Sequence, residues 1–450
     1  MILLLTFFTL CFETYISYKI FDKSFCSPAF IFCAGFTLAS ADLLTMVDYW
    51  KVDLHWNTYY VITGGCLVFI LISFAVKKAL RSFKLDTKGI SLDVFPTTRN
   101  EVNISKFMLL CVLAFNALSI MILSYKVISV IRSFGMYTGI LSSFGKYAAI
   151  SKFSNRNVSL GFLNNLMLFL RAEGYIFGNL VVVAYFKNKK IDFLLLLCFV
   201  SCVISTFITG SRGGSIYMIL SLVPSVYLCR EKKILKKPIK AKYIILLGLL
   251  GFGSLFLLQL VGSVMGRTMK EEVSPWAYIS IYLGAPIQNL DYFLQQPHEA
   301  SKVFGGTTFY YQIQYYAVGH NRLDLIYDFD LPFVKFNNHN AGNVYTIFYA
   351  FFYDFGYKGV VILTGLMALM IQTIYEYTLK SIRKPFSISR LFYMYMFPTI
   401  PLSFFSNKFY EGLTIAFVKM IIFWIILYLA LIQDKYKLKK KVRKCQNQSH

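Results

Sequence analysis

Charged side chains are scarce in this sequence of 450 residues. Only 15% of the residues are Asp, Glu, Lys or Arg, whereas 57% are hydrophobic, and the mean hydropathy is +0.56. One soluble core could not bury so much apolar surface, which excludes a soluble globular domain of this length. We therefore predict an all-α polytopic membrane protein that is surrounded mostly by lipid.

The motifs that usually bring in nucleotides, metals or an activated serine are also missing. The sequence has no Gly-x-x-x-x-Gly-Lys-Ser/Thr phosphate loop, no His-Glu-x-x-His zinc site and no Gly-x-Ser-x-Gly nucleophile elbow. Its nine cysteines fall mostly inside apolar runs and form no Cys-x-x-Cys or Cys/His cluster. We interpret them as packing residues, and we expect neither a metal nor another cofactor.

Acidic residues are fewer than basic ones. The sequence has 22 Asp and Glu and 46 Lys and Arg, which gives a net charge of +24. Membrane proteins collect basic residues in cytoplasmic loops beside lipid headgroups, so we expect membrane lipid rather than nucleic acid as the partner. The N-terminus lacks a basic segment, and Glu13 interrupts its apolar stretch. This favours a first span over a cleaved signal peptide.

Apolar windows of roughly 20 residues, the length needed to cross a bilayer, recur along the chain. They predict about eleven transmembrane helices, near positions 1–20, 27–47, 57–76, 106–130, 161–185, 191–209, 214–229, 243–261, 343–372, 391–405 and 413–432. Lys and Arg gather in alternate connections, which predicts an N-terminus outside the cytoplasm and a cytoplasmic C-terminus. The expected organisation is helices 1–8 in residues 1–261, a large outer loop in 262–342, helices 9–11 in 343–432 and a basic tail in 433–450.

The loop of about 80 residues is far longer than an ordinary connection, and such loops are commonly functional. It is rich in aromatic residues but too polar to cross the membrane, so we expect short helices that lie on the bilayer surface. Its main cations are Arg267, Lys270 and Arg322. Two of its histidines, His298 and His320, are interpreted as solvated surface residues.

Arg212 lies in the run Thr209-Gly-Ser-Arg-Gly-Gly214, between two predicted spans at the outer face. The glycines permit a tight turn and a close approach of backbone amides to a ligand. A guanidinium beside such amides suits a phosphate group, because its fork donates two parallel hydrogen bonds. The alternative is a snorkelling arginine on a glycine-rich hairpin.

The fifth predicted span contains two more ionisable residues, Arg171 and Glu173. Charged groups inside a membrane are costly, so each is a functional candidate. Arg171 follows Asn164 by nearly two helical turns, which places both on one face. That face lines either an internal ion pair or a water-filled cavity.

His339 stands in the polar run Asn337-Asn-His-Asn-Ala-Gly-Asn343, where the ninth predicted span begins. These side chains suit a sugar at a membrane mouth, or they cap the helix, since Asn is a favoured N-cap. Histidine titrates near neutrality, which makes His339 a candidate general base. Asp328 and Asp330 have the Asp-x-Asp spacing of metal and nucleotide-sugar binders, a pattern that also arises by chance.

Three segments together resemble the oligosaccharide repeat unit polymerases, the Wzy-type O-antigen and capsule polymerases. The first is the Thr209 to Gly214 run after an apolar helix, and the second is the aromatic and proline stretch from Tyr278 to Pro286. The third is Asn343-Val-Tyr-Thr346 followed by Tyr353-Asp-Phe-Gly356. A large outer loop late in the chain is also similar to this family.

The resemblance implies a GT-C-like glycosyltransferase in the bacterial cytoplasmic (inner) membrane, with a periplasmic N-terminus and a large periplasmic loop at 262–342. It would polymerise oligosaccharide repeat units carried on undecaprenyl diphosphate, by moving the growing glycan to the terminal sugar of a new lipid-linked unit. Both lipid-linked glycans are then partners, a polysaccharide chain-length regulator is a further possible partner, and neither nucleotide nor ATP is needed.

The same resemblance suggests roles for the residues singled out above. The cations that would hold the diphosphate and stabilise its growing charge are Arg212, Arg171 and Arg267, and Arg322 is a further cation that would bind the substrate. His339 or Glu173 would accept the proton of the acceptor hydroxyl. The side chains that would orient sugars are Asn340, Asn343, Tyr345 and Asp354.

Two rival functions stay open. An O-antigen ligase is one, because His339-Asn340 resembles the His-Asn element of that group. A lipid-linked oligosaccharide flippase or another transporter is the second. A flippase should show two similar halves and charges spread through its central spans, whereas here no internal repeat occurs and polar residues gather at the outer face.

Overall fold

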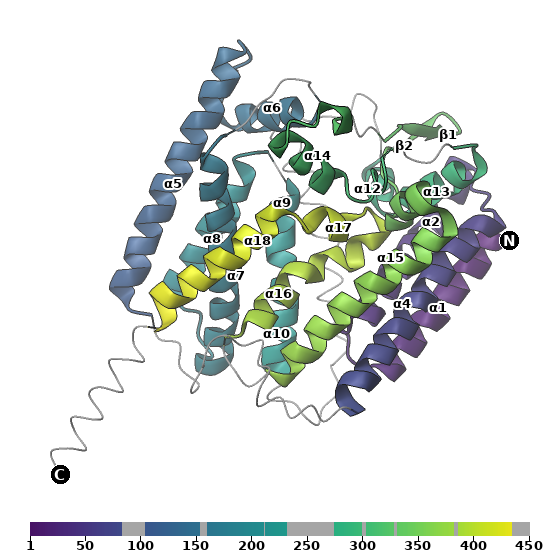
Figure 1. Ribbon diagram of the computed structural model, residues 1–450, viewed down its shortest axis with the longest axis horizontal. Coiled ribbons are helices and arrows are strands. Elements are labelled where there is room, and N and C mark those ends of the chain that lie inside the picture. Colours follow the sequence, from purple (N-terminus) through teal and green to yellow (C-terminus); the bar gives the residue numbers. More distant parts are fainter. Residues whose placement is uncertain are drawn as a thin grey trace. The chain divides into compact units, whose positions relative to one another are not determined.

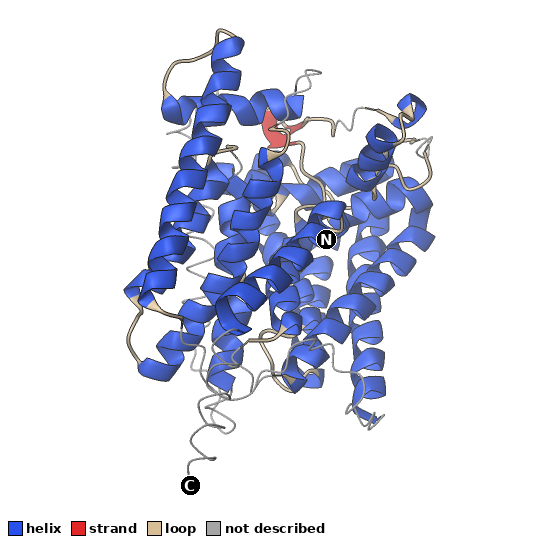
Figure 2. Cartoon of the chain, turned by 60° about the vertical axis from the view of Figure 1, so that its left-hand side comes forward, coloured by secondary structure: helices blue, strands red, loops and turns tan. Residues whose placement is uncertain are grey.

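The computed structural model of the chain describes residues 1–82, 104–153, 160–210, 212–231, 274–298, 303–327, 331–381 and 386–433. Helices dominate this part, as Figure 2 shows, and one two-stranded antiparallel hairpin is the exception. Six of the described helices are long and apolar enough to span a membrane: α1 (Ile2–Ile20), α2 (Pro28–Thr45), α4 (Trp56–Ser82), α5 (Lys106–Ser133), α7 (Leu163–Asn188) and α15 (Ile347–Lys380). The chain is therefore a mostly helical membrane protein, as its composition predicts.

Three predicted spans correspond to shorter helices, and the window at 413–432 contains one of them, α18 (Ile415–Tyr428). The window at 191–209 contains α8 (Phe193–Phe207), whose first turn is capped by Asp192. The window at 214–229 is divided between α9 (Arg212–Leu220) and α10 (Leu222–Glu231). The window at 243–261 lies outside the described residues, so the total of eleven spans stays a prediction.

The window predicted at 391–405 does not form one helix. It consists of α16 (Ile388–Met396) and two 3-10 turns, η2 (Phe397–Thr399) and η3 (Pro401–Phe404). Pro398 and Pro401 account for the break, because proline donates no backbone hydrogen bond and clashes with the preceding helical turn. A hydropathy average does not detect a helix break caused by proline.

The chain forms two compact units, each assembled from segments far apart in the sequence. Unit 1 takes its described residues from 1–94, 271–380 and 396–415. Unit 2 takes its described residues from 95–270, 381–395 and 416–450. The predicted organisation follows chain order and describes topology, so these spatial units are a different division of the same chain.

Unit 1 is a helical bundle in which α15 packs along α4 and α1 packs on α2 and α4 (Figure 1). Its core is aromatic: the rings of Phe32 and Phe69 stack with centroids 4.3 Å apart, and those of Phe36 and Phe348 stack at 5.1 Å. Gly65 of α4 permits this close packing, because a Cβ atom there would collide with the Phe348 ring.

Short elements complete unit 1 at one end of its bundle. They are α3 (Val47–Trp50), α12 (Pro275–Leu283), α13 (Ala285–Gln295), α14 (Tyr310–Gly319), η1 (Leu323–Leu325) and α17 (Lys408–Gly412). α12 packs on α2, and α13 packs on α2 and α4. The segment 262–342 thus contains short helices, as the sequence predicts, together with a hairpin that the sequence analysis does not anticipate.

The hairpin pairs β1 (Val334–Phe336) with β2 (His339–Gly342). Its two turn residues, Asn337 and Asn338, have φ angles of 49° and 62°, which fit a type I′ turn. The polar run around His339 therefore forms a turn and a strand. The cap of α15 is Thr346, whose Oγ1 accepts a hydrogen bond from the backbone N–H of Phe348 at 3.2 Å.

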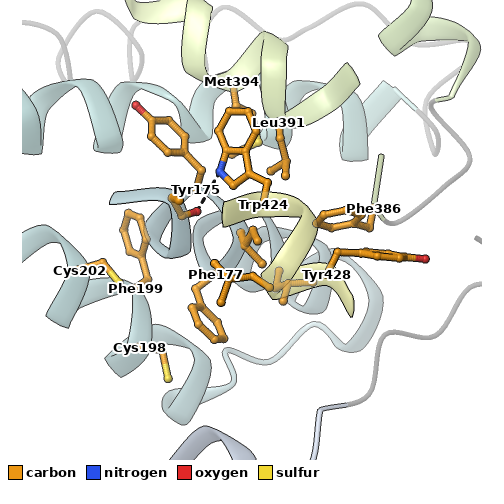
Figure 3. Packing of buried hydrophobic residues seen from close by; sticks show 14 of the residues in the cluster. Tyr175, Phe177, Cys198, Phe199, Cys202, Phe386, Leu391, Met394, Trp424 and Tyr428 are labelled. Carbon is orange, nitrogen blue, oxygen red and sulfur yellow. Dashed lines mark hydrogen bonds between the residues drawn. The ribbon is translucent and has the colours of Figure 1, made fainter. Parts of the chain in front are cut away.

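Unit 2 is built around α7, which packs on α8 and α10, while α5 packs on α8. Its core joins α7 and α8 to α16 and α18 (Ile415–Tyr428), and Figure 3 shows Trp424 beside Tyr175 within it. The Trp424 indole donates to the carbonyl oxygen of Ala172 at 3.0 Å. Because α7 is held in this way, the directions of Arg171 and Glu173 are set by packing.

Candidate anion-binding site

Arg171 projects from α7 inside unit 2. Its Nε atom is buried and has no hydrogen-bond partner, and no ion pair to Arg171 occurs in the part of the chain that the structure describes. Arg171 as a whole is half-buried. A partly buried guanidinium without a counter-ion in an apolar helical unit is unfavourable unless another group supplies the missing negative charge. Arg171 is therefore a candidate anion ligand.

The guanidinium of Arg171 reaches the first turn of α9. Its Nη2 atom lies 3.8 Å from the position that a Cβ atom would take on Gly214. The first turn of a helix presents N–H groups without intrahelical partners and carries a partial positive charge. A guanidinium aimed at such a turn creates a local environment that favours an anion, and phosphate groups suit it well.

The three glycines of the Thr209 to Gly214 run lie in different environments. Gly210 has a φ of +64°, and a Cβ there would collide with the backbone of Phe144 in α6 (Ile140–Phe153). This position therefore requires glycine. Gly214 leaves room beside Arg171, whereas a Cβ on Gly213 would meet no atom within 4 Å. The run predicted to approach a phosphate thus includes one glycine that opens space next to a cation.

Lys419 of α18 is a second cation of unit 2, and it contacts α7. Its Nζ atom donates to the Oδ1 atom of Asn165 at 3.0 Å, and no carboxylate pairs with it among the described residues. Lys419 is not among the residues predicted from the sequence. It could have been identified as an ionisable residue in an otherwise apolar helix, the same feature that indicates Arg171.

Two tyrosine rings stand near Arg171 in unit 2. The rings of Tyr175 and Tyr395 meet edge to face with centroids 5.6 Å apart, and the charge of Arg171 acts on both hydroxyl groups. Tyr395 also stacks on Phe417 at 4.9 Å. Aromatic rings and a guanidinium together form a surface with both apolar and cationic character, as a phosphate joined to an apolar chain requires.

Arg212 is the first residue of α9, but its side chain lies outside what the structure describes, as does all of Arg267. Their predicted contacts with the diphosphate therefore stay predictions. Lys270, Asp328 and Asp330 also lie outside the described residues.

Glu173 points away from Arg171, because residues two apart on a helix face different directions. Its Oε1 atom accepts a hydrogen bond from the Asn116 side chain at 3.0 Å, and Asn116 also donates to Ser201. Glu173 lines a cavity of about 230 Å³ whose other walls are Cys111, Val112, Phe115, Phe169 and Leu427. The structure thus shows no ion pair between Arg171 and Glu173, and it places the predicted base in an apolar cavity.

The residues predicted to contact sugars lie in unit 1. The His339 ring stacks on the Tyr49 ring with centroids 3.9 Å apart. The Oδ1 atom of Asn340 accepts from the backbone of Gly342 at 2.8 Å, and the buried Tyr345 hydroxyl donates to the Pro332 carbonyl at 3.0 Å. These contacts stabilise the hairpin and its flanks, and the half-buried Asn343 follows directly after β2.

Asp354 and Arg322 also have partners within unit 1. The carboxylate of Asp354 accepts hydrogen bonds from the backbone N–H groups of Thr307, at 3.1 Å, and Thr308, at 2.6 Å. Arg322 is exposed and pairs with Asp324 at 2.6 Å, a contact that raises the pKa of Arg322 and lowers that of Asp324. Each of these side chains therefore already has a partner within unit 1.

One further arrangement in unit 1 has the form of a catalytic pair. The buried Asp291 of α13 accepts from Nδ1 of His55 at 3.0 Å, from the backbone of His55 at 2.8 Å and from the hydroxyl of Thr58 at 2.6 Å. A carboxylate at Nδ1 favours the tautomer whose Nε2 atom can accept a proton. The His55 side chain is 53% exposed, so this nitrogen is within reach of solvent. His55 and Asp291 are 236 positions apart, and no local motif links them.

No protein-family model, no curated protein and no solved structure matches this chain.

Proposed function

We propose that this chain is an oligosaccharide repeat unit polymerase that acts on glycans linked to a lipid diphosphate. The observation that carries the proposal is the guanidinium of Arg171, unpaired among the described residues, at the first turn of α9. This turn belongs to the Thr209 to Gly214 run, the first of the segments that resemble the polymerase family. An anion site in an apolar helical unit suits a substrate whose charged group is attached to a membrane lipid.

The proposed reaction needs only a leaving group that is already activated. The acceptor hydroxyl oxygen attacks the anomeric carbon of the growing glycan, and the bond from that carbon to the diphosphate oxygen breaks. The lipid diphosphate leaves with the electron pair, and the hydroxyl proton passes to a base. Arg171 and Lys419 of unit 2 would stabilise the negative charge that develops on the leaving group.

The base can be sought among three side chains. Unit 1 offers His55, oriented by Asp291, and His339, stacked on Tyr49. Unit 2 offers Glu173. A general base contributes typically 10²–10⁴-fold to a rate, so its removal is easily distinguished from the loss of a packing contact.

The test uses a strain whose own polymerase is deleted and whose repeat unit matches this chain. We expect the wild-type protein to restore a ladder of glycan lengths on a gel. Arg171→Gln should reduce polymerisation by about 10²–10³-fold, the usual effect of removing a donor from a developing oxyanion. Arg132→Gln is the matched control, because it removes an exposed guanidinium of unit 2 that lies 4.6 Å from the centroid of the Tyr137 ring, and we expect a normal ladder.

A purified system distinguishes the rival functions. Polymerisation releases free lipid diphosphate and lengthens the lipid-linked glycan, whereas a ligase would transfer one glycan to a lipid A core acceptor. A flippase would move the lipid-linked glycan across a vesicle membrane without releasing diphosphate. The last two results would each replace the polymerase assignment.

A further inference from the structure

Three side chains that could bind a metal meet in the core of unit 1, each from a different helix. Glu13 comes from α1, Cys33 from α2 and Cys66 from α4. One carboxylate oxygen and the two sulfur atoms all lie within 4.8 Å of one another. Both cysteines are fully buried and Glu13 is 7% exposed.

The carboxylate of Glu13 is the unusual member of this cluster. Its Oε2 atom is buried and has no hydrogen-bond partner among the described residues. Hydroxyl groups nearby along the same helices are used elsewhere, since Thr14 pairs with Thr37 and Ser17 donates to the Thr14 carbonyl. A carboxyl group without a donor or a cation is costly in an apolar bundle, so this position calls for a further partner.

A second group of similar composition has a different hydrogen-bond pattern. In unit 2, Glu173 lies near Cys198 and Cys202, and its Oε1 atom accepts a hydrogen bond from Asn116, whereas its Oε2 atom is buried without a partner among the described residues. An amide donor therefore serves one oxygen of that carboxylate, and these three side chains do not form a potential metal-binding group of the kind seen at Glu13. Glu13 has no such donor, and its nearest potential ligands are thiols.

We propose that Glu13, Cys33 and Cys66 bind a zinc ion that holds α1, α2 and α4 together. Zinc accepts thiolate and carboxylate ligands in one site, whereas calcium and magnesium prefer oxygen alone. In a tetrahedral site with Zn–S bonds of about 2.3 Å, ligand atoms are about 3.8 Å apart. The observed separations are at most 4.8 Å, so rotation of the side chains can close the site without moving a helix.

Binding would release the protons of the thiol groups, because zinc is held by thiolates. Two thiolates balance the charge of the ion, and the Glu13 carboxylate adds an oxygen ligand and one further negative charge. A water molecule would take the fourth tetrahedral position. This proposal is independent of the polymerase assignment, since it concerns the folding of unit 1. It also explains why the sequence shows no metal motif, because its ligands are spread over three helices.

The experiment measures metals in the full-length protein, purified in detergent through a tag that does not bind metal. We expect about one zinc per chain by mass spectrometry of the elements, and cobalt exchange should produce a thiolate-to-cobalt absorption band. Cys33→Ser and Cys66→Ser should abolish the band and lose most of the zinc, and Glu13→Gln should weaken zinc affinity at least about tenfold. The double variant with Cys198→Ser and Cys202→Ser should retain zinc.

The wild-type protein alone can overturn the proposal, even if a variant fails to fold. Absence of zinc from protein supplied with zinc during expression and purification would contradict it, and so would copper in its place. A disulfide between Cys33 and Cys66 in peptides from the unreduced protein would contradict it as well. A zinc content that persists in both single cysteine variants would show that the ion lies elsewhere.

Discussion

The Nη2 atom of Arg171 lies 3.8 Å from the point where Gly214 would carry a Cβ atom. A side chain larger than that of glycine would therefore fill the space beside the guanidinium. Gly213, the preceding residue of α9, faces open space at the corresponding point. The two glycines lie in the same helical turn, but only Gly214 has side chains next to its Cβ position. They form a matched pair for substitution.

We expect Gly214→Val to reduce polymerisation more than tenfold, because its side chain would contact Thr206 and displace the Arg171 guanidinium. Gly213→Val should have little effect, since valine has a helix propensity slightly better than that of glycine. The length ladder of surface glycan measures this difference, with equal membrane expression as the control. Equal losses for both variants would remove the argument for space beside Arg171.

Asp291 should contribute more to stability than His55, although the two form one pair. Asp291→Ala leaves the Thr58 hydroxyl and the His55 backbone without their acceptor, at a cost of about 1–3 kcal/mol for each buried donor. His55→Gln keeps the backbone contact and changes a ring that is largely exposed. Thermal unfolding in detergent should therefore show a larger drop for Asp291→Ala.

If His55 is the base, His55→Gln should also lower the rate of purified, folded protein by about 10²–10⁴-fold. An unchanged rate in this variant would exclude His55 and return the role to His339 or Glu173. The stability result does not depend on that outcome, because it follows from hydrogen bonds within unit 1.

Asp354 is expected to act on stability rather than on substrate binding. Its two hydrogen bonds to the backbone of Thr307 and Thr308 are charge-assisted, so Asp354→Ala should destabilise the protein by about 1.5–3 kcal/mol or more. Asp354→Asn keeps one acceptor and should cost less. A thermal melt checks the order of the variants, and a selective loss of sugar affinity at unchanged stability would argue for substrate contact instead.

Asp22, in the connection between α1 and α2, provides a test of pH dependence. Partial burial raises the pKa of its carboxyl group, but hydrogen bonds and charge from Lys77 and Arg81 outweigh burial and lower that pKa below its ordinary value. A lowered folded-state pKa gives stability that is complete above the unfolded value of about 4 and is lost as the pH falls through the folded value.

The side chain of Asp22 is 59% exposed, so solvent screening limits its contribution to about 1 kcal/mol or less. We expect the melting temperatures of wild type and Asp22→Asn to differ at neutral pH and to converge as the pH falls below the lowered folded-state pKa of Asp22, where both lack the charge. A difference that stays constant over this range would show that packing, not charge, is responsible.

The helical membrane character could be predicted because hydropathy depends on each residue's own side chain. The break at Pro398 and Pro401 was visible in the sequence too, but a hydropathy window averages over it. The hairpin at Asn337 and Asn338 depends on two consecutive positive φ angles, which asparagine permits but does not demand. These differences are local, and each has a known stereochemical cause.

The candidate sites were less predictable, because they depend on contacts between distant segments. Arg171 was found as a charge in an apolar helix, yet its neighbour Gly214 could be paired with it only in the structure. His55 precedes α4 and Asp291 lies on α13, while Glu13, Cys33 and Cys66 come from three different helices. A single sequence offers no covariation that would bring such residues together.

Because α15 packs along α4, the contact between them can form only after the ribosome has synthesised both helices. Ser82 ends α4 and Ile347 begins α15, 265 residues later in the chain. At a ribosomal rate of about 5–20 residues per second, α4 emerges roughly 13–50 s before its partner. During that interval the surface around Gly65, shaped for a close neighbour, must be shielded by lipid or by an insertion factor. The newborn protein is thus most vulnerable to mispairing in its earliest helices, long before its last residue is translated.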